Sequence, residues 1–184
     1  IFSGSNRHLL HEMFGQSSRP LYRLCKAMTI ERIESKDYVI FLQKAALEKW
    51  GASLDEKVLD KIFFYSEFHP FYLNAICEIL WSKKEIPSCE YVDEAWGWYV
   101  ANHKNIITSD LISLSINQKK VLQSLAEGPV KEPYSAEFSN KTKLSLSSIK
   151  QSVASLVSKD IIFKNANEEY KILDPAILYY FRNF

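Results

Sequence analysis

The residues best suited to recognise another molecule lie in a helix predicted over residues 145–158. Ile149, Val153 and Leu156 recur at the spacing of one helix face, which should therefore be buried. The opposite face and its flanks carry hydroxyl, amide and ammonium groups, which can bond phosphates or the edges of bases in a DNA groove. The sequence thus predicts a DNA-binding surface made of Lys143, Ser147, Ser148, Lys150, Gln151, Ser155 and Lys164.

A solvated face that contacts protein is the alternative for the same helix. The helix has no arginine, although arginine to guanine is the commonest specific contact with DNA. Residues 115–184 hold ten basic and seven acidic side chains, a smaller excess than strong DNA binders usually carry. The sequence leaves DNA and protein open as partners of this segment.

Catalytic and metal-binding patterns are weak elsewhere. His8, His11 and Glu12 lie close together on a short predicted helix but fall short of a full ligand set, so we predict no metal site. The chain contains no Gly-x-Ser-x-Gly elbow and no Gly-x-x-x-x-Gly-Lys-Ser/Thr loop. The chain alone is therefore expected not to hydrolyse a nucleotide. An aromatic stripe is expected to serve core and interface rather than a cofactor: Tyr91, Trp96, Trp98 and Tyr99.

The composition is that of a folded protein without a membrane span. Of the 184 residues 47% are hydrophobic and 14% are aromatic, and the net charge is +1. Such a chain can bury a core, which argues against disorder. No apolar run reaches the roughly 18 residues that span a bilayer. The cysteines Cys25, Cys77 and Cys89 are odd in number and lack metal-ligand spacing, which favours a reduced, cytoplasmic setting.

Hydrophobic periodicity predicts an all-helical module in the middle of the chain. Ser35 is the expected N-cap of its first helix and Gly51 the expected end. The first helix should bury Tyr38, Phe41, Leu42 and Ala45. The predicted helices are 35–50, 55–68, 70–81 and 90–103.

A different pattern follows and predicts a winged helix-turn-helix. Three helices, a β-hairpin and a closing helix in this order are typical of that fold. The predicted elements are helices 117–126, 135–140 and 145–158, strands 161–164 and 169–172, and a helix that Asp174-Pro175 opens.

The amino-terminal residues read as the end of a buried strand. Ile1-Phe2 is apolar and Ser3-Gly4-Ser5 is a polar turn. A strand stub cannot satisfy its backbone alone, so we expect it to complete a larger sheet. On this interpretation the chain is a fragment, the later part of a longer protein.

Short motifs in a fixed order then carry a family resemblance. Ser3-Gly4-Ser5 is followed by Arg-Pro-Leu-Tyr-Arg at 19–23, by His69-Pro70-Phe71-Tyr72-Leu73 in the helical module, and by the winged helix. This order resembles the C-terminal part of AAA+-related P-loop ATPases of the STAND type, in particular archaeal and bacterial ATP-binding proteins that end in a winged helix. The resemblance implies a mainly α fold: a remnant of an α/β P-loop sheet (1–34), a helical lid (35–112) and a winged-helix domain (113–184).

The resemblance also implies nucleotide-sensing roles. Ser5, or Ser3 as second choice, matches the sensor strand beside the γ-phosphate, where a hydroxyl can orient the attacking water. Arg19, with Arg23 second, matches a phosphate-facing arginine, since a guanidinium bonds phosphate bidentately. His69-Pro70 matches the lid element whose proline packs on adenine. A strand-to-helix cap, a structural salt bridge and plain helix initiation are the respective alternatives.

We therefore expect the lid and winged helix of an ATP-driven switch whose P-loop core lies upstream of Ile1. The intact protein would use ATP and Mg, and the fragment would bind neither. Its winged helix would contact DNA or a protein, and no membrane is implied. The rival is a stand-alone winged-helix transcriptional regulator with a helical dimerisation domain. A third possibility is an adaptor whose winged helix binds a protein partner.

Overall fold

The computed structural model describes residues 13–18, 20–22, 24 and 33–183, except the side chain of Asp110. Four helices form the first part: α2 (Ser35–Trp50), α3 (Glu56–Ser66), α4 (Pro70–Trp81) and α5 (Cys89–Asn102). The last three pack on one another, and α2 meets α3 and α4 through the ring pairs Tyr38–Phe63 and Trp50–Trp81. A short helix, α6 (Lys104–Ile112), leads into the second part. That part comprises α7 (Ile116–Ala126), α8 (Ala136–Thr142), α9 (Leu146–Ser158), β1 (Ile162–Lys164), β2 (Tyr170–Ile172) and α10 (Pro175–Asn183). The described residues are thus mainly helical, as predicted.

The ends of the first four helices follow from local chemistry, with one correction. Asp55 and Ser88 cap α3 and α5 by accepting backbone N–H bonds, and Pro70 occupies the first position of α4. Gly51 ends α2 with φ of 70°, a conformation that glycine adopts without strain. The expected N-cap of α2 was wrong: Ser35 is already helical, and the residue before it makes no side-chain cap.

Helix α6 was not predicted, because its apolar residues do not follow one face. Ile107 and Leu111 are buried, whereas their neighbours Ile106 and Ile112 are 66% and 77% exposed. Because each buried residue stands next to an exposed apolar one, the sequence does not show the 3.6-residue spacing of apolar residues that marks a helix. His103 lies between α5 and α6 and is both the last capping residue of α5 and the first of α6.

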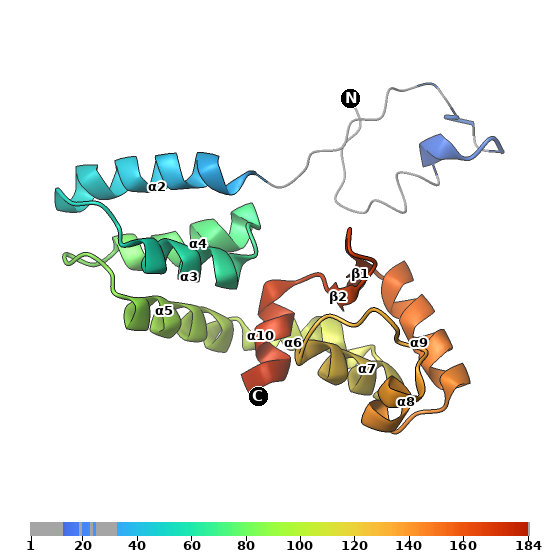
Figure 1. Cartoon of the computed structure of the whole chain (residues 1–184). Coiled ribbons are helices and arrows are strands. Elements are labelled where there is room, and N and C mark those ends of the chain that lie inside the picture. Colours follow the sequence, from blue (N-terminus) through green and yellow to red (C-terminus); the bar gives the residue numbers. More distant parts are fainter. Residues whose placement is uncertain (1–12, 19, 23, 25–32, 184) are drawn as a thin grey trace.

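The core runs through both parts of the molecule. In α2, Tyr38, Leu42 and Ala46 are buried, whereas Phe41 is 64% exposed, which corrects the predicted inward face. Trp96 on α5 is fully buried. Figure 1 shows α10 lying between α5 and α7, and α10 packs against both. The last helix therefore joins the two parts.

The winged helix has the predicted order of elements. Ser115 and Gln118 form a capping box at α7, and Ser145 caps α9 by accepting the N–H of Ser148. The strands β1 and β2 pair antiparallel, and a bridge between Val130 and Tyr170 extends the hairpin towards α8. Asp174 closes the unit, since its Oδ1 accepts the N–H groups that open α10.

Candidate functional site

The connection between α3 and α4 is tight and holds a left-handed backbone at two consecutive residues. Glu67 and Phe68 have φ of 45° and 57°, which is unusual for residues other than glycine. The Phe68 ring stacks on Phe63 at 4.9 Å between centroids. His69 then occupies the N-cap position and Pro70 begins α4 with an exposed ring. The sequence motif thus lies at the N-terminal end of a helix.

A cleft of about 1570 Å³ is lined by this connection, by the hairpin and by α10. Its lining comes from both parts of the molecule and mixes apolar, basic and acidic side chains, among them Phe64, Phe68, His69, Pro70, Phe163, Lys171, Glu67 and Asp174. His69 and Pro70, two of the predicted nucleotide-sensing residues, therefore border a space that a ligand can enter. This cleft could not be predicted from residue patterns, because the residues on its two sides are far apart in the chain.

Four further predicted residues, Ser3, Ser5, Arg19 and Arg23, lie outside the described residues. The pair His8 and His11 does so too. The nucleotide-sensing roles of the first four, and the expected absence of a metal site at the histidine pair, stay predictions.

The helical module and the winged helix contact each other at this cleft, mainly through polar groups. Glu67 Oε2 lies 2.8 Å from Lys171 Nζ on β2, and both side chains are at most a quarter exposed. The hydroxyl of Tyr72 on α4 donates to Oδ2 of Asp174 before α10. The rings of Tyr65 and Tyr179 also meet edge to face at 5.9 Å. None of these pairs could be found by sequence spacing.

The outward face of α9 presents most of the predicted recognition residues. Ser147, Lys150 and Gln151 are exposed. Ser148 is half-buried, and Ser145 Oγ donates to its hydroxyl at 3.0 Å. Ser155 differs from the expectation: it faces α7 and accepts a hydrogen bond of 2.8 Å from Gln118 Nε2.

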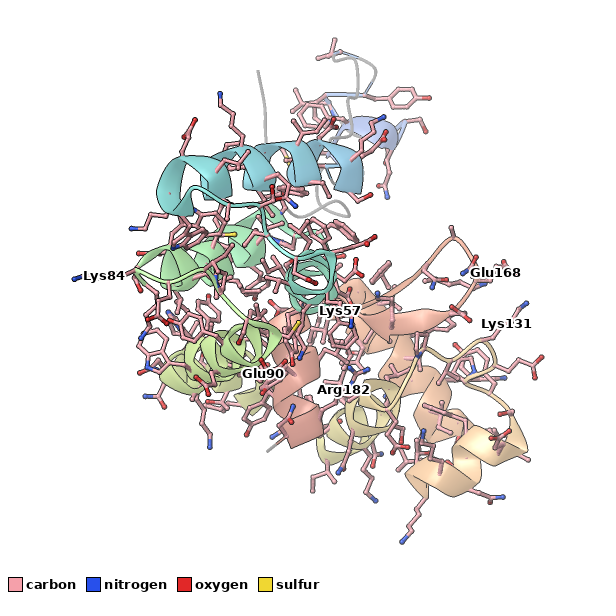
Figure 2. All side chains as sticks on the ribbon, turned by 60° about the vertical axis from the view of Figure 1, so that its left-hand side comes forward. Lys57, Lys84, Glu90, Lys131, Glu168 and Arg182 are labelled. Carbon is pink, nitrogen blue, oxygen red and sulfur yellow. The ribbon has the colours of Figure 1, made fainter. Side chains whose placement is uncertain are left out.

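The predicted lysines around α9 have mixed surroundings. Lys143 is exposed at the end of α8. Lys150 lies over the ring of Tyr134, 5.9 Å from its centroid. Lys164 pairs with Glu168 at 3.1 Å, so its charge is partly neutralised. Figure 2 shows Glu168 at the tip of the wing, where a DNA-binding wing would normally meet phosphate.

A second polar cluster stabilises the helical module. The Asp93 carboxylate accepts a hydrogen bond of 2.6 Å from the Tyr65 hydroxyl and another from Lys61 Nζ. Burial alone would raise the pKa of Asp93, but the bonds from Lys61 and Tyr65 outweigh it and lower the pKa below its usual value. The stabilisation is therefore present above the pKa of an unfolded aspartate and is lost as the pH falls through the lowered one. Lys61 and Asp93 are 31% and 42% exposed, so the cluster lies at the surface of the module, where it joins α3 to α5.

Comparison with known proteins agrees with these features. Residues 107–183 match a family described as "probable winged helix domain". The second part of the chain is a winged-helix domain. A Walker-type ATPase of Pyrococcus abyssi has a similar solved structure, with a TM-score of 0.70 and 18% identity over 97% of this chain and 51% of that one. The chain therefore spans about half the length of that ATPase.

The expected likeness to a P-loop ATPase that carries a winged helix is confirmed at the level of the fold. No curated protein matches the chain. Among the described residues, no group of three or more His, Cys, Asp or Glu side chains could hold a metal ion. None of the helices in the described part is both long and apolar enough to cross a membrane.

Proposed function

We propose that this chain is the lid and winged helix of an ATP-dependent switch, and that nucleotide bound at the start of α4 changes the position of the winged helix. The observation that carries the proposal is the fold shared with a Walker-type ATPase over 97% of the chain. The exposed Pro70 at the first turn of α4, beside the cleft, supports it further.

The start of α4 has the chemistry for a lid contact. A proline at the first helical position offers a flat apolar ring that a base can cover. The positive end of the helix dipole beside it favours an anion. In the intact protein a P-loop core would supply the phosphate site and Mg, while Ser5 and Arg19 would contact the γ-phosphate. The free thiols of Cys77 and Cys89 suit the reducing cytoplasm that we propose as its location.

Titration with ATP tests this function. The full reading frame should bind Mg-ATP measurably by calorimetry, whereas the 184-residue chain alone should not, because it has no phosphate-binding loop. Pro70→Ala should weaken binding by about threefold to tenfold, since one apolar face on the base is lost. Phe71→Ala, at an exposed neighbour, is the matched control and should leave affinity unchanged. Absence of ATP binding by the full protein contradicts the proposal.

For the partner of the winged helix we propose a protein rather than duplex DNA. The lack of net positive charge on the wing supports this choice, because Glu168 and Glu169 balance its two lysines and Glu168 pairs with Lys164. The outward face of α9 carries a single charged side chain, Lys150. A surface that neutralises few phosphates releases few counterions and binds DNA weakly.

A salt-dependent gel-shift assay checks the choice of partner. We expect no retention of random duplexes at about 150 mM salt, and at most weak retention at low salt with a shallow salt dependence. Glu168→Lys together with Glu169→Lys should increase retention at low salt. Tight, steeply salt-dependent binding by the unmodified chain that Lys150→Ala weakens would instead favour DNA as the partner.

A further inference from the structure

We infer that two contacts, Glu67–Lys171 and Tyr72–Asp174, form a latch that makes the winged helix follow the first turn of α4 as one rigid body. The inference deepens the proposed function, on which its link to nucleotide rests. The mechanical coupling itself rests only on the contacts across the cleft, so it can be tested without nucleotide.

The first contact ties the connection before α4 to the wing. Glu67 and Lys171 are 21% and 25% exposed, so water screens their attraction less than that of a surface pair. Glu67 also holds a left-handed backbone, as does Phe68. Such conformations persist only where surrounding contacts hold them. The ion pair is one such contact, and its loss should let the connection relax.

The second contact ties the first turn of α4 to the start of α10. Asp174 uses both carboxylate oxygens: Oδ1 accepts the N–H groups of Ala176 and Ile177, and Oδ2 accepts the hydroxyl of Tyr72. Tyr72 is only two residues after Pro70 and 8% exposed. A movement of Pro70 should therefore also move Asp174, the cap of α10, because the buried Tyr72 side chain connects the two.

Aromatic packing next to the latch holds the helical module against the winged helix. Tyr72 and Tyr179 both contact Trp96, with ring centroids 5.6 Å and 6.0 Å away. A Cβ on Gly97 would lie 3.3 Å from Tyr179 Oη, so α5 and α10 approach closely there. Interfaces packed in this way shift as units rather than deform continuously.

The cleft places the latch within reach of a ligand. Glu67 and Lys171 line it, and so does Asp174 beside Pro70. A ligand that binds one arrangement of the latch residues more tightly than another would shift the equilibrium between positions of the winged helix. The difference between the two affinities sets the size of that shift.

Amide hydrogen exchange on the 184-residue chain tests the latch. Glu67→Lys should raise exchange at Ala176 and Ile177 about tenfold, because a partly buried charged bond is lost. Combining it with Lys171→Glu should restore exchange to nearly the original rate. Tyr72→Phe, which removes only a hydroxyl, should raise exchange at the same two amides.

The matched control reverses the ion pair within the wing, with Lys164→Glu and Glu168→Lys, and should leave Ala176 and Ile177 unchanged. Faster exchange confined to residues 66–69 in the Glu67→Lys variant would overturn the latch. So would failure of the charge reversal to restore protection. Because no nucleotide is present, a failed ATP titration with intact latch behaviour would reject the proposed function alone.

Discussion

Trp96→Ala is expected to lower the free energy of unfolding by about 4 kcal/mol, the typical cost of removing a buried tryptophan. The side chain is fully buried and contacts Tyr65, Tyr72, Tyr99 and Tyr179. Its indole N–H has no hydrogen-bond acceptor among the described residues, so the cost should arise from packing. Against a typical total stability of about 5–15 kcal/mol, such a loss is large.

Urea unfolding followed by circular dichroism measures this effect independently of tryptophan fluorescence. Trp98→Ala is the matched control, because Trp98 is two residues along α5 and 59% exposed. It should cost less than about 1 kcal/mol. Equal losses for the two variants would show that Trp96 is not the centre of the core. If Trp96→Ala does not fold, Trp96→Phe should fold with a smaller loss.

Asp174→Ala should be the second most damaging substitution, at about 3 kcal/mol. About 1 kcal/mol is the cost of losing a helix cap. The remainder is the loss of a charged acceptor for the Tyr72 hydroxyl, for which about 2 kcal/mol is typical. The two losses act at one carboxylate that serves both parts of the molecule.

Asp55→Ala separates the two contributions. Asp55 caps α3 through one oxygen, which accepts the N–H of Lys57 at 2.8 Å, and no bond to the winged helix is found for it. Urea unfolding should give a loss of about 1 kcal/mol for this variant. If Asp174→Ala costs no more than Asp55→Ala, the bond between α4 and Asp174 adds nothing to stability.

Local signals in the sequence predicted the elements of the winged helix and most of the helical module. Pro70 marks the start of α4, and Ser145 marks that of α9, because each acts on the backbone next to it. The period of α6 was hidden by apolar pairs that point both ways. Phe41 was misplaced for a related reason: a helix face drawn from spacing alone does not say how far the neighbouring helix covers it.

Tertiary contacts account for what could not be predicted at the candidate site. Tyr72 and Asp174 are 102 residues apart, and no residue pattern connects them. Spacing assigns Ser155 to the outward face of α9, whereas in the structure it accepts a hydrogen bond from Gln118 of α7. Sequence spacing assigns a residue to a side of its own helix, whereas its partners depend on the packing of the other helices.

Hydrogen exchange of the full reading frame with and without Mg-ATP tests the central claim most directly. The account predicts that saturating ATP slows exchange at residues 66–73, where α3 gives way to α4, and that the change extends to the start of α10. Pro70→Ala should reduce the protection at both places. Binding of ATP with unchanged exchange in residues 66–73 would contradict the claim that this lid responds to nucleotide.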